Sequence, residues 1–220
     1  GGCTFKCMEY PTYGHGRIDL VKALATSCNI YFHELGVKTR IENIDLWAKR
    51  FGLGEYTGIE LPSENKGIRA NMTTKRELRN DDWRPADTAQ TAIGQFDNAF
   101  TPIQLASYVS TLANGGKKYK AHIVKEIRKH DGSIVLKSEP EYEDLQIKKE
   151  TIELVHRGMV EVANAQDGTA NKIFDDLKPI IVAGKTGTPE TGFEHLGQSS
   201  NGLFIAYAPA DNPQIAVAVV

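Results

Sequence analysis

Three apolar runs of β-type residues constrain the fold of this chain most. They cover residues 180–187, 201–208 and 214–220. Short apolar runs bounded by turn residues are typical of buried strands. Residues 209–213 read P-A-D-N-P, a turn composition, so the second and third strands are predicted to be antiparallel neighbours. The first run ends in K-T-G-T at residues 185–188, which would place a cation, two hydroxyls and an open backbone ladder at a strand edge.

The triplet G-K-T at residues 184–186 also fits part of a phosphate-binding loop. That loop requires a glycine where this chain has Pro179, and a following helix, which Pro189 would interrupt. The residues between Pro179 and Gly184 are an apolar strand, not a glycine-rich cradle. We therefore do not predict a nucleotide site. The plainer alternative for K-T-G is a lysine at a hairpin turn without a function.

Helical signals dominate the chain before these strands. Asp19 is placed to cap a helix over residues 20–26, and a second short helix is predicted over 30–36. Further helices are predicted over 41–51, over 102–114, and around Ile152, Val155, Met159 and Val162. A surface β-hairpin is predicted at about 122–137. The predicted fold class is α/β of the α+β kind, with an antiparallel sheet covered by helices.

A basic, polar stretch runs from residue 69 to residue 84 and is interrupted by Met72 and Trp83. We interpret it as a long solvated loop. The alternative is a segment that covers a cleft or binds a partner.

A second motif lies far upstream of the lysine strand. Ser27, Cys28 and Asn29 form a serine-x-asparagine element, and K-T-G follows it at residues 185–187. In this order the two elements resemble the transpeptidase domain of the penicillin-binding proteins, most closely the class B type. Other stretches fit the family pattern: residues 14–20, 57–62, 92–95, 101–106 and 113–116. One departure is Phe96, where many relatives carry glycine.

The resemblance implies a fold like that of penicillin-binding proteins and serine β-lactamases, and it extends over residues 1–220. The region 1–175 would be mainly helical and carry the hairpin, and 176–220 would supply the sheet strands. The family's S-x-x-K element is not found upstream of Ser27. The chain's literal match, Ser63 with Lys66, lies in a polar turn and in the wrong order, so we interpret it as spurious. We expect a domain truncated at both ends and inactive alone.

The resemblance also implies roles for the catalytic residues. Ser27 would relay a proton, Asn29 would bind a substrate amide and fix the missing lysine, and Lys185 would supply positive potential. The alternatives without a catalytic role are helix capping for Ser27 and Asn29, and a solvated strand lysine for Lys185.

Three residues next to Lys185 would bind the substrate. The Thr186 and Thr188 hydroxyls would hold its terminal carboxylate, and the Thr188 N–H would form half of an oxyanion hole. Gly187 would let a peptide add to the strand edge without meeting a Cβ atom.

The implied reaction is D,D-transpeptidation of cell-wall stem peptides that end in D-Ala-D-Ala, through a serine acyl-enzyme that β-lactams would also form. The family is tethered by an N-terminal membrane helix at the extracytoplasmic face of the bacterial membrane, so a fragment without it is expected to be soluble. Cell-wall assembly proteins are the expected partners.

Two alternatives stay open: a penicillin-recognising sensor, and a serine β-lactamase that would use Glu60, Glu64 or Glu77 for deacylation.

Composition excludes other classes and leaves one question about metal. A net charge of −2 gives no general attraction to nucleic acid, and no apolar stretch is long enough to span a bilayer. The implied catalysis needs no cofactor. Cys3, Cys7 and His15, with Asp19 or Cys28 as a fourth ligand, have the residue types of a structural zinc site. Buried reduced cysteines or a Cys3–Cys7 disulfide are the alternatives.

Overall fold

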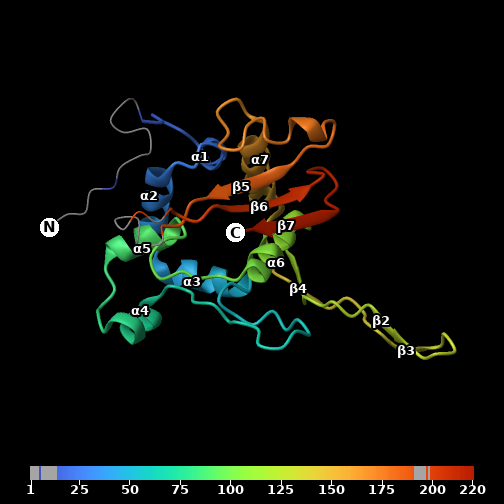
Figure 1. Ribbon diagram of the computed structural model, residues 1–220. Coiled ribbons are helices and arrows are strands. Elements are labelled where there is room, and N and C mark those ends of the chain that lie inside the picture. Colours follow the sequence, from blue (N-terminus) through green and yellow to red (C-terminus); the bar gives the residue numbers. More distant parts are fainter. Residues whose placement is uncertain (1–4, 6–13, 191–196, 198) are drawn as a thin grey trace.

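The computed structural model describes residues 5, 14–190, 197 and 199–220. Helices and strands follow in the order α1 to α6, β1 to β4, α7, and β5 to β7 (Figure 1). The helices are α1 (Leu20–Ala25), α2 (Asn29–Thr39), α3 (Ile41–Arg50), α4 (Met72–Arg79), α5 (Pro85–Ala92), α6 (Pro102–Ala113) and α7 (Lys149–Asn164). The strands are β1 (Lys117–Tyr119), β2 (Glu126–Arg128), β3 (Ile134–Lys137), β4 (Tyr142–Asp144), β5 (Ala183–Gly187), β6 (Leu203–Ala208) and β7 (Ile215–Val219).

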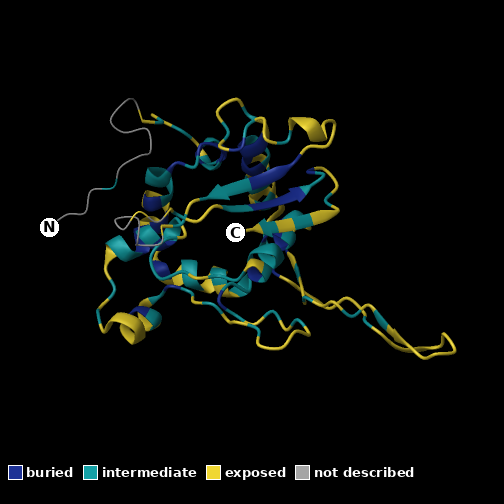
Figure 2. Cartoon of the chain, in the orientation of Figure 1, coloured by how far each residue is buried: buried dark blue, intermediate teal, exposed yellow. Residues whose placement is uncertain are grey.

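The three final strands form an antiparallel sheet in the order β5-β6-β7. Helix α7 packs on β5, and α6 packs on β6 and β7. The core between helices and sheet includes Val109, Met159, Ile205 and Tyr207, and β5 and β6 are the strands with buried residues (Figure 2). The predicted fold class, an antiparallel sheet covered by helices, is confirmed.

One strand is shorter than the apolar run predicts. Strand β5 begins at Ala183, while Ile180 and Ile181 are 46% and 48% exposed. The N–H of Ile180 turns back to the carbonyl of Leu177, and the carbonyl of Ile181 accepts a bond from Ala210. The first apolar residues of the run therefore lie in the approach to the sheet and not in its ladder.

Local capping signals place several helices where the sequence predicts them. The Asp19 carboxylate accepts a 2.9 Å hydrogen bond from the N–H of Lys22 and begins α1. Thr101 and Gln104 form a reciprocal capping box at α6. Such bonds satisfy backbone donors that have no partner inside the helix. The predicted helices before and after the hairpin are confirmed to within a few residues of their ends.

The interpretation of residues 69–84 as a solvated loop is wrong. This stretch contains α4, which begins with a capping box between Asn71 and Thr74 and ends at Asn80 in a left-handed conformation. The side chain of Lys75 is only 3% exposed and binds Asp87 at 2.7 Å. The charged composition suggested a solvated loop, but Lys75 of this helix is buried against a carboxylate and is not solvated.

The predicted hairpin is confirmed and is longer than expected. Strands β2 and β3 pair antiparallel, and β1 and β4 form a second pair at the base of the same arm. The arm projects from the body of the protein, and its outer part is mostly exposed (Figures 1 and 2). Within the described ranges, no helix has the length and apolar character needed to cross a membrane.

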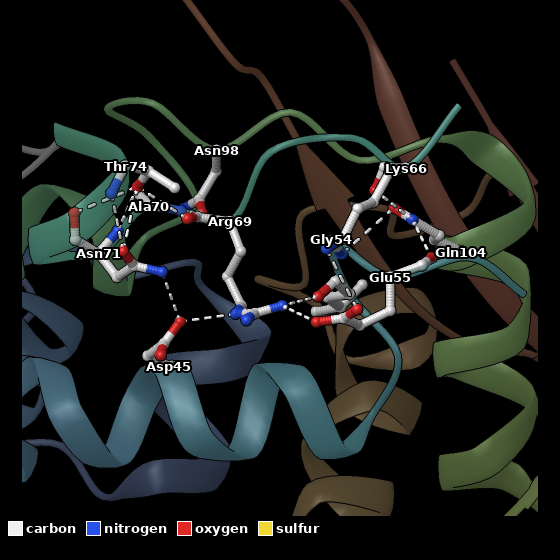
Figure 3. Close-up of polar contacts among 11 residues, drawn as sticks. Asp45, Gly54, Glu55, Lys66, Arg69, Ala70, Asn71, Thr74, Asn98 and Gln104 are labelled. Carbon is white, nitrogen blue, oxygen red and sulfur yellow. Dashed lines mark hydrogen bonds and ion pairs between the residues drawn. The ribbon is translucent and has the colours of Figure 1, made fainter. Parts of the chain in front are cut away.

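A partly buried polar network joins the long segment between α3 and α4 to α6 (Figure 3). Arg69 binds Asp45 of α3 at 2.6 Å, and the carbonyl of Leu53 and the carboxylate of Glu55 at 2.8 and 3.0 Å. Gln104 is 1% exposed, and its amide donates to the carbonyls of Glu55 and Lys66 at 2.6 and 2.8 Å. The irregular segment is thus held from both ends by side chains.

Replacing Gln104 with methionine should therefore lower the free energy of unfolding by roughly 2–4 kcal/mol, because two carbonyls would lose their hydrogen bonds in a buried site. Urea unfolding measures this. Gln214→Met is the matched control, since Gln214 is exposed and donates to the nearby Asn212 carbonyl. An equal effect in both variants would contradict the assignment.

Candidate active site

Ser27 lies at the corner between α1 and α2. Its φ of 51° is in the left-handed region. The chain turns there because the N–H groups of Ser27 and Cys28 bond back to the carbonyls of Leu24 and Ala23, at 3.2 and 2.9 Å. Cys28 is buried and begins α2 from an extended conformation. The corner therefore presents the serine from a fixed turn.

The lysine of the K-T-G strand reaches this corner. The ammonium of Lys185 donates to the Ser27 hydroxyl at 2.9 Å and to the carbonyl of Thr186 at 2.8 Å. Ser27 and Lys185 are 158 positions apart in the sequence. The fold thus brings together the two elements that the sequence assigns to one site.

Burial changes the acid–base behaviour of this lysine. Removal of the Lys185 ammonium from water lowers its pKa from 10.5 to about 8. A desolvated ammonium interacts with an anion more strongly than a solvated one does. Near neutral pH the group remains mainly protonated, so it can receive a carboxylate.

The residues after Lys185 form the open end of β5. The Thr186 hydroxyl lies 2.8 Å from that of Thr169, in the connection between α7 and β5. A Cβ atom at Gly187 would lie 3.1 Å from Leu203 Cδ2, so packing on β6 also favours glycine there. Thr188 is exposed just beyond the strand, and its carbonyl accepts a 3.4 Å bond from Gln95.

Asn29 is the first residue of α2, next to the corner. The N-cap position is Cys28, so Asn29 does not cap this helix. Its side chain is half-buried and forms no hydrogen bond with the described residues. Asn29 therefore lies next to Ser27, with an amide that no other described side chain or backbone group binds.

Two contacts of the site were not predicted. Thr169 bonds to Thr186, and its N–H donates to Ala25 at 3.1 Å, yet no motif marks it. Gln95 lies in one of the stretches that fit the family pattern, but the sequence did not predict a role for it. Both contacts join segments that are distant in sequence, so periodicity gives no signal for them.

The alternative nucleophile lies in another environment. Ser63 is exposed, has a φ of 62° and sits in a turn, not at the start of a helix. Lys66 forms an ion pair with Glu55 at 3.5 Å. These residues do not form the serine–lysine pair of the family motif.

The glutamates considered for deacylation have other partners. Glu64 accepts bonds of 2.7 Å from the N–H and the hydroxyl of Thr57, and Glu60 accepts a 3.0 Å bond from the N–H of Ile123. Glu77 is exposed on α4. The first two carboxylates thus stabilise turns and the base of the hairpin arm.

The zinc prediction gains no support. Cys3 and Cys7 lie outside the described residues. The described residues include His15, Asp19 and Cys28. Among them, there is no group of three His, Cys, Asp or Glu side chains that could hold a metal ion. Zinc therefore stays a prediction from the cysteine pattern alone.

Comparison with known proteins identifies the family of this chain. A family model described as the penicillin binding protein transpeptidase domain matches residues 1–220. The chain belongs to this family. Membership agrees with the juxtaposition of Ser27 and Lys185, because serine-x-asparagine and K-T-G are family elements.

The similar curated proteins are named as peptidoglycan transpeptidases or penicillin-binding proteins. The chain is 31% identical to the peptidoglycan D,D-transpeptidase MrdA of Acinetobacter baumannii, over 100% of this chain and 34% of that protein. It is 33% identical to penicillin-binding protein 2B of Streptococcus pneumoniae, over 87% of this chain and 28% of the relative. The chain spans about a third of the length of these curated relatives.

Solved structures give the same result for the fold. A complex of PBP2 and MreC from Helicobacter pylori superposes with a TM-score of 0.82 at 30% identity, covering 99% of this chain and 38% of that one. PBP2 of Pseudomonas aeruginosa in complex with WCK 5153 gives 0.80 at 32% identity, covering 95% and 45%. The similar proteins favour neither the sensor nor the β-lactamase alternative.

Proposed function

We propose that this chain forms part of the catalytic domain of a serine-type peptidoglycan D,D-transpeptidase. The 2.9 Å contact of Lys185 with Ser27 carries the proposal, because it joins a hydroxyl that can relay a proton and a partly buried cation at one strand end. Family membership and the transpeptidase names of the relatives support the reaction class. The catalytic roles of Ser27, Asn29 and Lys185 are part of the same proposal.

The reaction requires a serine–lysine pair that we place on an S-x-x-K element outside the printed residues. The serine oxygen gives its proton to the lysine of the pair and attacks the carbonyl carbon between the two terminal D-alanines, which forms an acyl-enzyme ester as the peptide C–N bond breaks. Ser27 relays that proton to the leaving D-alanine nitrogen. An amine of a second stem peptide then attacks the ester and forms the new amide, and the proton it loses returns by the same relay to the departing serine oxygen.

The substrate carboxylate would be recognised at the open end of β5. The Lys185 ammonium supplies positive charge, the Thr186 and Thr188 hydroxyls donate to the carboxylate oxygens, and Gly187 leaves the strand edge accessible. The Thr188 N–H would donate to the oxyanion that forms at the attacked carbonyl. Asn29 would donate to the amide of the stem peptide.

Partners and location follow from the relatives and are likewise proposals. The structure of PBP2 from Helicobacter pylori is a complex with MreC, so we propose a cell-wall assembly protein as partner here. The working location would be the extracytoplasmic face of the bacterial membrane, through an anchor outside the printed residues. No cofactor is needed for the proposed chemistry.

Intact-mass spectrometry after incubation with a penicillin tests the proposal. We expect the protein as its gene encodes it to gain the mass of one penicillin, on the serine of an S-x-x-K element. The 220-residue chain should gain none. Peptide mapping locates the adduct, and an adduct on Ser27 or Ser63 would overturn the assignment.

The pH dependence of acylation by an anionic penicillin provides a second check. The second-order rate constant reports groups of the free enzyme, so it should fall as the pH rises above about 8, where Lys185 loses its charge. Lys185→Arg keeps its charge at these pH values and should lose this decline. A decline near pH 8 that persists in the arginine variant would assign it to another group.

A further inference from the structure

Phe96 adopts a backbone conformation that is uncommon for a bulky residue. Its φ is 69°, in the left-handed region. The ring packs edge-on against Trp83, with centroids 5.5 Å apart and planes at 82°. The guanidinium of Arg79 lies 5.0 Å from the ring centre, and the ammonium of Lys75 lies 5.7 Å from it. Both cations come from α4, the helix that replaces the predicted loop.

The same cations are held by carboxylates. Arg79 donates through two nitrogens to Asp97, at 2.6 to 3.1 Å, so the residue after Phe96 is fixed to α4. Buried Lys75 binds Asp87 of α5 at 2.7 Å and Asp81 at 3.0 Å. Together these contacts fix the ring against α4 and against Trp83 in the connection from α4 to α5. We call Lys75, Arg79, Trp83, Phe96 and Asp97 the Phe96 cluster.

A second anchor follows directly in the sequence. The Asn98 amide donates to the carbonyls of Gln95 and Thr91, at 3.2 and 3.4 Å. Its oxygen accepts a 3.0 Å bond from the N–H of Ala70, just before the N-cap of α4 (Figure 3). The carbonyl of Gln95 is therefore bonded to Asn98, which also holds Ala70 next to the start of α4, and the residue after Gln95 belongs to the Phe96 cluster.

The side chain of Gln95 reaches the end of the K-T-G strand. Its amide nitrogen donates to the carbonyl of Thr188, and its oxygen accepts from the N–H of Glu190, both at 3.4 Å. These two backbone groups flank Pro189, so one side chain bridges the exit of β5. Because both bonds are long, a displacement of a few tenths of an ångström would break them.

From these contacts we infer that Phe96 and Arg79 are positioning residues for acyl transfer. They hold Gln95 where it fixes Thr188, and Thr188 supplies the proposed oxyanion donor and a carboxylate-binding hydroxyl. The inference rests on the proposed function and adds a task for α4 and for the phenylalanine that departs from the family pattern. Loss of the ring would let Thr188 shift relative to the reacting carbonyl, which slows the chemical step.

Two variants of the protein as its gene encodes it test the inference. Phe96→Gly removes the ring, and glycine accepts a positive φ without strain. Gln95→Glu keeps the length of the side chain but removes the N–H that bonds to Thr188. Stopped-flow measurement with a penicillin separates the acylation rate constant from the dissociation constant of the preceding complex. We expect the rate constant to fall about tenfold in each variant, with the dissociation constant changed less than threefold.

Matched controls separate positioning from stability. Trp47→Ala on α3 removes an aromatic ring that also lies against a cation. The guanidinium of Arg50 is 4.1 Å from the centre of the Trp47 ring. This substitution should lower the thermal unfolding midpoint and leave the acylation rate constant unchanged. Phe96→Tyr retains the ring and should acylate at the rate of the unmodified protein.

The outcomes are distinguishable. If the unmodified protein is not acylated, the proposed function fails, and this inference with it. If it is acylated and both folded variants match its acylation rate constant, the inference alone is overturned. Should Phe96→Gly fail to fold, Arg79→Gln decides, because it keeps the Phe96 ring and removes the cation and the two-nitrogen bond to Asp97 that hold it. A loss in Trp47→Ala equal to that in Phe96→Gly would also overturn it.

Discussion

Replacing Lys185 with methionine should slow acylation by a penicillin about 100- to 1000-fold, the range observed when one group that stabilises transition-state charge is removed. Methionine has a similar length but cannot donate to the Ser27 hydroxyl, which accepts from Lys185 at 2.9 Å. The substituted site would lose its partly buried cation and the contact that orients Ser27, the proton relay of the proposed mechanism. The acylation rate of the protein as its gene encodes it provides the measurement.

The same substitution should make the fold more stable at neutral pH. Burial lowers the pKa of Lys185 from 10.5 to about 8, so the folded state binds this proton less tightly than the unfolded state does. Below pH 8 both states are protonated and the cost of the buried charge is fully present. As the pH rises from about 8 to 10.5 that cost disappears, and the stability of the unmodified protein increases. We expect Lys185→Met to gain ~2 kcal/mol at pH 7 and progressively less towards pH 10.5.

Lys178 offers a control for both effects. It lies just before the sheet, is exposed, and pairs with Asp175 at 2.8 Å. Lys178→Met should change neither the acylation rate nor the pH dependence of urea unfolding. Activity retained in Lys185→Met, or a stability that falls at pH 7, would contradict the role given to Lys185.

Some of this structure is predictable because its signals are local. Asp19 and Thr101 mark helix starts through bonds to residues three positions away. The apolar runs mark β5, β6 and β7, although Ile180 and Ile181 fall outside the ladder. Spacing alone does not show that Ser27 meets Lys185. The resemblance to the family predicts that meeting, because it assigns both elements to one site.

The rest depends on pairings that leave no periodic signal. Helix α4 is rich in charge, and its burial of Lys75 becomes visible only with Asp87 beside it. Gln95 bonds to Thr188 from 93 positions away, and Thr169 bonds to Thr186 from 17 positions away. Neither residue type predicts such a bond. Phe96 is informative as a departure from the family, but the cations that hold its ring come from the segment that the sequence analysis interpreted as a loop.

The position of Ser27 depends on how closely α1 packs on α7. Gly158 of α7 lies against Leu24 of α1: a Cβ atom there would be 2.5 Å from Leu24 Cδ1 and 2.8 Å from Leu24 Cβ. The second distance involves an atom next to the backbone, so rotation of the leucine cannot relieve the overlap. Helix α1 itself would have to move, and Ser27 lies three residues beyond Leu24.

Gly158→Val should therefore lower the free energy of unfolding by about 1–3 kcal/mol through overpacking, and slow acylation more than tenfold as the hydroxyl of Ser27 leaves Lys185. Urea unfolding and the acylation rate test the two effects separately. Arg157→Val is the matched control, because Arg157 is the exposed neighbour on the same helix and the new residue has the same helix propensity.

A second substitution identifies the cause. Leu24→Ala removes the atoms that a valine at position 158 would meet first, although the alanine keeps its Cβ. If overlap moves α1, the double variant should lose less stability than the sum of the two single losses, and part of the acylation rate should return. Additive losses, or acylation that stays normal in Gly158→Val, would show that the close approach of α1 and α7 does not set the position of Ser27.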